Sequence, residues 1–352
     1  MRSFRLLLAQ LLLVVAWAGS AAAGPAPPLY LALGDSLAAG VGASEPAQTG
    51  YVGLVFDALR TEPASPYREG GLDLLNLGDP GETTTSIQAS GGQMEKALAE
   101  IESRRDDDIA GNEVAVITID IGANDFIPLV LGDSPCLPNP LASACQEAAG
   151  TALTTFRANF TDIMRGLRAA AGPEVEVVAL GLYNPLSGTG GPFDAVGDAA
   201  LGLFNNTVGA AAADPAIQAT LADVFSLFQD RGPELTHITE LPPDVHPNDS
   251  GHYLMARAVL TALGLPADAV ATPPSGAPPL RLSTPTPTPR ATVSLPTVAP
   301  TSTVRALSSA GGNGDNDTPW AVYIGLVVAS VVVVAAGLVV FARRRADRGR
   351  RE

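Results

Sequence analysis

The chain has 352 residues, and its 36 acidic residues outnumber its 21 Lys and Arg, which leaves a formal net charge of −15. A surface this negative repels phosphate backbones, which excludes nucleic acid as an expected partner. The C-terminal tail is itself basic, so the rest of the chain is more acidic than the total suggests.

The N-terminal residues are typical of a secretory signal peptide. Arg2 and Arg5 precede an apolar run at 6–17, and three alanines follow at 21–23. Basic, apolar and small residues in this order form a cleaved export signal. We therefore expect residues 1–23 to be removed and the mature chain to leave the cytoplasm.

Residues 25–271 are expected to form one folded domain, because their length is within the range of single α/β domains. Apolar runs rich in Val, Leu and Ile predict buried strands at 29–33, 72–77, 113–121 and 175–182. Helical patterns lie at 52–60, 86–104, 147–170, 193–212 and 251–263, and the segment 221–228 fits either a strand or a helix. Strands that alternate with helices predict a parallel sheet with helices on both sides, which binds ligands beyond the carboxyl ends of its strands.

The only two cysteines of the chain are Cys136 and Cys145, which lie close together in the sequence. Exported proteins enter an oxidising environment, in which such a pair forms a disulfide. We therefore expect a local disulfide that stiffens its loop.

Three further segments follow the domain. Residues 272–318 are rich in Pro, Thr and Ser and are expected to form a disordered stalk. Residues 320–341 contain no charged residue and would extend about 33 Å as a helix, which is enough to cross a bilayer. The Arg-rich residues 342–352 predict a cytoplasmic tail, and hence a single-pass membrane protein whose domain is extracellular. A processed sorting signal made of the stalk and the apolar segment is the alternative.

Four polar motifs stand at the ends of predicted strands or next to the last helix. They are Gly34-Asp35-Ser36, the stretch 76–84 (NLGDPGETT), Gly122-Ala123-Asn124-Asp125 and the stretch 244–252 (DVHPNDSGH). Because parallel strands end at the same edge of a sheet, we expect the four loops to converge on one face.

Together these loops hold the groups that acyl transfer requires. The reaction needs a hydroxyl nucleophile, an imidazole base, a group that orients the imidazole, and N–H donors for the oxyanion. Ser36 and His246 are the predicted nucleophile and base. The predicted oxyanion donors are the backbone amides of Ser36 and Gly81 and the side-chain amide of Asn124.

The same residues make the chain resemble the SGNH or GDSL family of serine hydrolases. Ser36 lies in GDSL, Gly81 in an N-x-x-x-x-G-x-T stretch, Asn124 in GAND and His246 in HPNDSGH. The resemblance implies a flavodoxin-like three-layer α/β/α sandwich and an esterase or lipase in which these four residues have the roles given above. It implies no metal and no organic cofactor.

The acid that orients His246 departs from the pattern of this family. Relatives usually carry it three residues before the histidine, where this chain has Pro243. Asp244 lies only two residues before His246, and we favour it as the acid. A backbone carbonyl that orients the imidazole in a Ser-His dyad is the alternative, and Glu240 and Asp249 are weaker candidates.

Other residues of the same types are expected to be structural. A second Gly-Asp-Ser, at 132–134, follows no strand that begins the domain and is predicted to be a turn. His237 lies in a Thr-rich loop and His252 precedes an apolar helical face. No cluster has the spacing of metal ligands, and neither G-x-S-x-G in the mature domain nor a phosphate-binding loop occurs.

The sequence thus predicts a membrane-anchored extracellular serine esterase or lipase. It is expected to cleave carboxylic esters through an acyl-enzyme on Ser36, with His246 as general base. Its expected partners are small-molecule, lipid or acylated-glycan esters, together with the membrane. The alternatives are a glycan O-deacetylase of the same fold and a surface-binding module that has lost its activity.

Overall fold

The computed structural model describes residues 27–69, 71–107, 109, 111–129, 134–136, 139, 142–190 and 194–270. The predicted signal peptide, stalk, membrane helix at 320–341 and tail all lie outside these residues. Among the helices that are described, none is both long enough and apolar enough to cross a bilayer.

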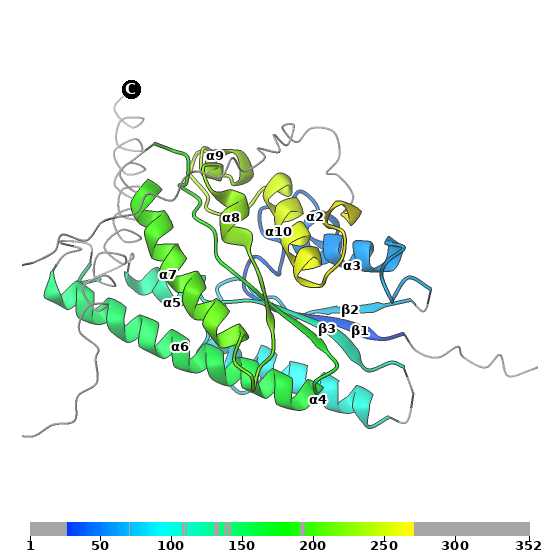
Figure 1. Ribbon diagram of the computed structural model, residues 1–352. Helices are drawn as coiled ribbons and strands as arrows, with labels where there is room; N and C mark the ends of the chain where they lie inside the picture. Colours follow the sequence, from blue (N-terminus) through cyan, green and yellow to red (C-terminus); the bar gives the residue numbers. More distant parts are fainter. Residues whose placement is uncertain are drawn as a thin grey trace, which may run out of the picture.

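The described part of the chain contains one sheet of five parallel strands (Figure 1). The strands are β1 (Leu29–Gly34), β2 (Asp73–Asn76), β3 (Val114–Asp120), β4 (Glu176–Leu180) and β5 (Thr220–Ala222). They lie in the order β2-β1-β3-β4-β5, which is the flavodoxin-like doubly wound order. The strand order reverses at β1, so the loops after β1 and β3 leave the sheet at its topological switch point.

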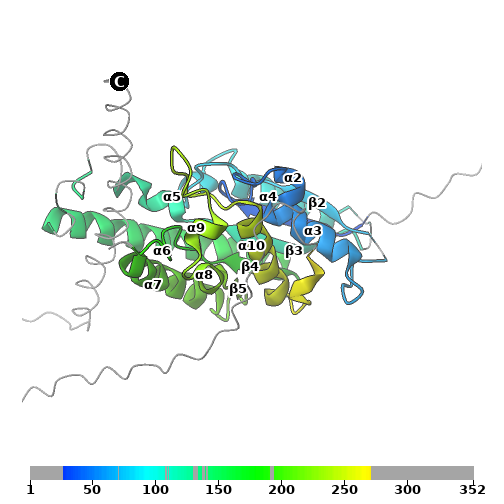
Figure 2. The same ribbon diagram turned by 90° about the horizontal axis from the view of Figure 1, so that it is seen from above.

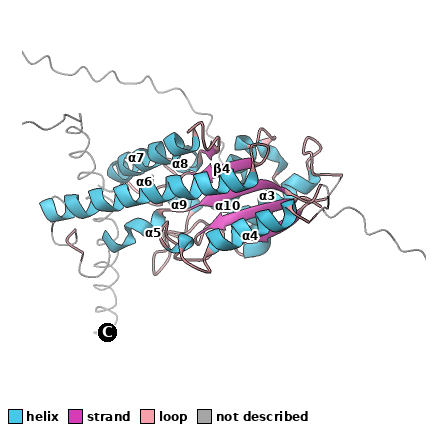
Figure 3. Cartoon of the chain, turned by 90° about the horizontal axis from the view of Figure 1, so that it is seen from below, coloured by secondary structure: helices cyan, strands magenta, loops and turns pink. Residues whose placement is uncertain are grey.

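Helices cover both faces of the sheet, which gives the domain three layers (Figures 1 and 2). One face is covered by α3 (Tyr51–Thr61) and α10 (Asp249–Ala262). The other is covered by α4 (Gln93–Arg105), α6 (Ser143–Ala171) and α7 (Asp194–Ala212), which Figure 3 shows from below. The loops contain short turns of helix, namely α2 (Pro46–Thr49), η2 (Ser86–Gln88), α5 (Ala123–Phe126), η3 (Ile127–Leu129), α8 (Val224–Phe228), α9 (Gly232–Leu235) and η4 (Ala267–Ala269).

The residues of β1 show why an apolar run builds this architecture. Successive side chains of a strand point to opposite faces of its sheet. Leu29, Leu31 and Leu33 pack into the core that contains α4, α6 and α7. Tyr30 and Ala32 pack into the core that contains α3 and α10. Since both faces are buried, both sets of positions must be largely apolar.

The predicted elements are confirmed, with two differences at their boundaries. The segment predicted as one helix at 86–104 divides into η2 and α4, because Gly91 has a φ of +75° and interrupts the helix. The ambiguous segment 221–228 contains both structures, the end of β5 and then α8. The carboxylate of Asp223 accepts a hydrogen bond from the Ser226 amide and thereby caps the start of α8.

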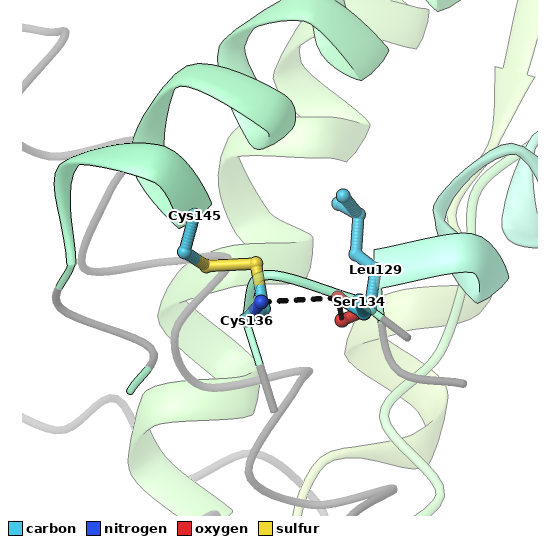
Figure 4. The surroundings of a disulfide bond; sticks show 4 residues. All are labelled: Leu129, Ser134, Cys136 and Cys145. Atoms are coloured by element: carbon cyan, nitrogen blue, oxygen red, sulfur yellow. Dashed lines mark hydrogen bonds between the residues drawn. A yellow bond between two sulfur atoms is a disulfide. The ribbon is translucent and has the colours of Figure 1, made fainter. Parts of the chain in front are cut away.

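The predicted disulfide between Cys136 and Cys145 is present, with a sulfur–sulfur distance of 1.99 Å (Figure 4). It links the loop after β3 to the first turn of α6. Ser134, the serine of the second Gly-Asp-Ser, is buried beside it. Its hydroxyl donates to the Leu129 carbonyl at 2.6 Å and accepts from the Cys136 amide at 3.1 Å. This serine therefore has a structural role, as predicted.

A cluster of aromatic rings connects α6 to the loop after β3. The ring of Phe156 is fully buried, with its centroid 5.5 Å from that of Phe160 and 4.5 Å from that of Phe204. A Cβ on Gly122 would lie 2.5 Å from the Phe156 ring, and Gly122 has a φ of +123°. The aromatic core therefore requires a glycine here, two residues before Asn124.

Replacing Phe156 with Ala is expected to destabilise the domain by about 3–5 kcal/mol, because it empties a fully buried site between two other rings. Urea denaturation followed by circular dichroism measures the loss. Phe56→Ala is the matched control and should cost less, since Phe56 is only partly buried. Equal losses in the two variants would contradict this account of the core.

Candidate active site

The loops after β1, β2 and β3 are joined at the carboxyl edge of the sheet. The backbone amide of Asp35 donates to the Asp120 carbonyl at 3.2 Å, and that of Asp79 donates to the Gly34 carbonyl at 3.1 Å. The Asn76 side-chain amide donates to the Ala38 carbonyl at 2.7 Å. These bonds hold the end of β1 and residues 35–44, which we call the nucleophile loop, against the two neighbouring loops.

The segment before α10 reaches the same place and brings His246 to Ser36. The Ser36 hydroxyl oxygen lies 3.0 Å from His246 Nε2, although the two residues are 210 positions apart. His246 Nδ1 lies 2.6 Å from the Asp244 carboxylate. An ionised carboxylate only accepts hydrogen bonds, so Nδ1 carries the hydrogen and Nε2 is left to accept the Ser36 hydroxyl. All four predicted loops therefore converge.

The structure places Asp244 on the imidazole and the two weaker candidates elsewhere. The Asp244 carboxylate also accepts the His246 amide at 3.0 Å, and this local turn lets an acid two residues before the histidine reach the ring. Burial raises the pKa of Asp244, but the two hydrogen bonds from His246 outweigh it and lower the pKa overall. Glu240 contacts His237, and Asp249 accepts hydrogen bonds from Ser44.

Two backbone amides at the site have no acceptor among the residues that the structure describes. Every other amide from 34 to 41 donates to an acceptor outside or within the loop. The amides of Ser36 and Gly81 donate to none of the described residues. Gly81 is exposed, and its φ of +89° turns its loop sharply. Both N–H groups are therefore available to a bound oxyanion.

Asn124 lies between the nucleophile loop and the Gly81 loop. Its side-chain nitrogen donates to an Asp35 carboxylate oxygen at 3.2 Å and to the Glu82 carbonyl at 2.9 Å. Both hydrogens of this amide are thus engaged in the resting structure. Asp125 is structural, because its carboxylate accepts the amide and the hydroxyl of Thr84 and so ties α5 to the second loop.

A second carboxyl, that of Asp120 at the end of β3, lies under the nucleophile loop. It accepts the Ala38 amide and the Tyr51 hydroxyl, each at 3.0 Å, and both Asp120 and Asp35 are 1% exposed. Burial raises the pKa of Asp120 well above its usual value, and the Asp35 carboxylate raises it further. Burial also raises the pKa of Asp35, against hydrogen bonds from Leu37 and Asp120 that lower it. Burial therefore disfavours the ionised form of both carboxyls, and more strongly that of Asp120.

Sequence reasoning missed Asp120, because it ends an apolar strand and belongs to none of the four motifs. The sequence feature that points to Asp120 is a carboxylate at the last position of a buried strand, directly before Ile121-Gly122. An ionised carboxylate at this position has no access to solvent, because the strand lies in the centre of the sheet.

His252 is fully buried and lies behind the nucleophile loop. Its Nε2 lies 3.0 Å from the Val41 carbonyl and its Nδ1 accepts the Tyr51 amide at 3.3 Å. Burial lowers the pKa of His252 to about 4, so the ring is neutral. Its predicted structural role fits these contacts. Among the described residues, no three His, Cys, Asp or Glu are grouped so that they could hold a metal ion.

A hydroxyl paired with an imidazole and a carboxylate, next to unpaired amides at the switch point of a doubly wound sheet, is the arrangement of a serine hydrolase. Residues 32–254 match the model of the GDSL-like lipase/acylhydrolase family, which is more than half of the chain. The chain belongs to this family and is a serine hydrolase of carboxylic esters.

Solved structures match the chain at low identity. The lipase Lip_vut3 from a goat rumen metagenome is 22% identical, with a TM-score of 0.49 over 67% of this chain and 97% of that chain. The acetylxylan esterase Axe2 from Geobacillus stearothermophilus is 20% identical, with a TM-score of 0.46 over 71% of this chain and 100% of that chain. No curated protein sequence matches the chain.

Replacing Asp120 with Asn is expected to raise thermal stability at neutral pH and to leave it unchanged near pH 3.5. The folded-state pKa of Asp120 lies above its unfolded value, so the wild type loses stability as the pH rises from about 4 towards the folded-state pKa. Asn keeps the shape and does not ionise. Thermal melts between pH 3.5 and pH 8 should show a gain of a few degrees at the upper end, where about 2–4 °C corresponds to 1 kcal/mol.

The matched control is Asp57→Asn, since Asp57 is exposed on α3. It should show no gain that grows with pH. An Asp120→Asn variant whose stability follows the wild type at every pH would contradict a raised pKa of Asp120.

Proposed function

We propose that Ser36 is the nucleophile and His246 the general base of a carboxylic ester hydrolysis that passes through an acyl-enzyme. The observation that supports this most is the 3.0 Å separation of Ser36 Oγ and His246 Nε2, with Asp244 on the other ring nitrogen. A base must lie within hydrogen-bond reach of the proton that it takes, and His246 does so.

The reaction proceeds in two halves that use the same groups. Ser36 Oγ attacks the ester carbonyl carbon while its proton passes to His246 Nε2. The bond to the alcohol then breaks, and the alcohol leaves with that proton. Water next attacks the acyl-enzyme and gives one proton to Nε2, which returns it to Ser36 Oγ as the carboxylic acid leaves. Asp244 stabilises the imidazolium that forms in each half.

The negative charge of the tetrahedral intermediate would be met by the amides of Ser36 and Gly81, which have no protein acceptor in the described part of the chain. Asn124 is the proposed third donor. Its side-chain nitrogen now donates to Asp35 and to the Glu82 carbonyl, so it would exchange one of these acceptors for the substrate oxygen.

A fluorophosphonate probe is expected to label the wild type at Ser36, because the probe reacts with a serine that an adjacent base activates. Ser36→Ala should abolish both labelling and ester hydrolysis. His246→Ala should lower kcat/KM by about 10²–10⁴-fold, the usual contribution of a general base. The measurements are mass spectrometry of the labelled peptide and hydrolysis of acetyl and longer-chain nitrophenyl esters.

Ser134→Ala is the matched control, since Ser134 lies in the second Gly-Asp-Ser but is buried and hydrogen-bonded. Labelling must survive in this variant. A wild type that neither reacts with the probe nor hydrolyses any of these esters would refute the proposed roles of Ser36 and His246.

We also propose that the enzyme is displayed outside the cell by a single C-terminal membrane helix. This proposal rests on the sequence, where residues 320–341 contain no charge and Arg343 begins a basic tail. The segment at 272–318 would then separate the enzyme from the bilayer.

The full-length chain is expected to sediment with membranes and to need detergent for release, whereas a variant that ends at Thr318 should be recovered in soluble form. Cell fractionation followed by immunoblotting measures this. Recovery of the full-length chain in the medium without detergent would contradict anchoring, and a mature form that lacks residues after the stalk would indicate processing instead.

A further inference from the structure

The chain has three histidines, and all three contact the nucleophile loop. His246 contacts the Ser36 hydroxyl, and His252 contacts the Val41 carbonyl. His237 Nε2 lies 2.8 Å from the Gly42 carbonyl oxygen. Each ring has one nitrogen that contacts the nucleophile loop and one that does not. The group bound to the other nitrogen determines whether the ring carries a charge.

The partners of His237 differ from those of the other two. His252 faces one acceptor and one donor, and His246 faces a carboxylate and a hydroxyl, so a neutral ring satisfies both. His237 faces two acceptors, because its Nδ1 lies 2.6 Å from the Glu240 carboxylate. Both of its nitrogens must carry a hydrogen to satisfy these contacts, which makes His237 an imidazolium.

The electrostatics of the surroundings agree with this charge. Burial lowers the pKa of His237, but the Gly42 carbonyl and the Glu240 carboxylate outweigh it, and Asp244 adds a smaller effect in the same direction, so that the pKa is raised. From α10, His252 is neutral and Asp249 is engaged by Ser44 and Thr49. The nucleophile loop itself presents only a carbonyl to the ring.

The backbone of His237 belongs to the segment that carries the triad base. Its amide donates to the His246 carbonyl at 3.1 Å, and its carbonyl accepts the Asp244 amide at 3.2 Å. We call residues 236–247 the base loop. Its packing against the nucleophile loop is close, because a Cβ on Gly42 would lie 2.2 Å from the Pro247 carbonyl oxygen. His237 therefore joins the two loops, through the Gly42 carbonyl on one side and the backbone of His246 on the other.

We propose that His237 is a positioning residue for ester hydrolysis, which as an imidazolium bound to Glu240 and to the Gly42 carbonyl holds the base loop against the nucleophile loop. At alkaline pH the imidazolium loses one of its two N–H protons, which leaves either Glu240 or the Gly42 carbonyl without a donor. The interaction between the base loop and the nucleophile loop is then weaker. This inference rests on the proposed function of Ser36 and His246. A displacement of about 1 Å between reacting groups can cost about 100-fold in rate, so such a hold matters for catalysis.

The direction of the pH dependence follows from the charged state. In the folded protein the pKa of His237 lies above its ordinary value of 6.5. The charged ring therefore contributes fully to holding the two loops together below pH 6.5, and this contribution is lost as the pH rises through the folded-state pKa. The proposal therefore adds an alkaline decline to the pH profile of kcat/KM that does not originate from His246.

The first test changes the charge of the partner and leaves its hydrogen-bond acceptor in place. Glu240→Gln should move the alkaline decline to lower pH by about half a unit at low salt and by less at high salt, since the Glu240 side chain is 62% exposed. Glu102→Gln removes an exposed carboxylate from α4 instead and should leave the decline where it is.

The second test removes the titrating group. In the double variant His237→Gln with Glu240→Gln, an amide can still donate to the Gly42 carbonyl, and neither side chain ionises. The alkaline decline should disappear, with kcat near neutral pH within about tenfold of the wild type. His237→Ala should lower kcat by about 10–100-fold with little change in KM, because it removes the contact and no substrate group.

A separate measurement does not depend on turnover. Since the chain has three histidines, NMR can follow each imidazole through a pH titration, with His237→Gln assigning one signal. His237 should titrate above pH 6.5. If the wild type proves inactive at every pH, the roles of Ser36 and His246 fail, and this titration still decides the state of His237.

An alkaline decline that is unmoved in both Glu240→Gln and the double variant would overturn the proposal. A His237 that titrates at or below the value of a free histidine would also overturn it.

Discussion

The site depends on a close approach between the end of β1 and the end of β3. Gly34 ends β1 with a φ of +146°, and a Cβ there would lie 1.9 Å from a carboxylate oxygen of Asp120. Only glycine tolerates both the backbone conformation and the contact. Because Gly34 leaves this space, the Asp120 carboxyl reaches beneath the nucleophile loop and accepts the Ala38 amide. The position of Ser36 is thus set by two adjacent strands together.

Two buried carboxyls cost folding free energy, and the surrounding structure limits that cost. The raised pKa of each carboxyl disfavours a state in which the pair carries two negative charges. Tyr30 and Thr118, whose hydroxyl oxygens lie 2.9 Å apart, extend the polar layer away from the site. Among the buried side-chain atoms described, the two without partners belong to Asn112 and Ser250, outside this layer. A buried polar network whose members are paired is rigid, which suits a loop that must hold a nucleophile in place.

Much of the fold could be predicted because burial on both faces of a parallel strand requires apolar runs, and β1, β3 and β4 have them. The boundaries were less predictable where a local interaction decided them, as at Gly91, which interrupts a helix, and at Asp223, which caps α8. In the site, Ser36, Gly81, Asn124 and His246 could be found because they lie in recognisable motifs. Asp120 and His237 could not be found from the sequence, because neither belongs to a motif. Each acquires its role from partners that are distant in the sequence.

The sequence by itself determined the layers of the domain and the chemical groups of the site, because hydrophobic periodicity and motif residues are local properties of the chain. Only the tertiary structure decided which acid meets Nδ1 of His246, which two carboxyls are buried together, and which histidine faces two acceptors. These depend on burial and on hydrogen-bond partners, and here the partners lie as far as 211 residues apart. A protonation state is a property of the folded surroundings, and the surroundings exist only once the loops have met.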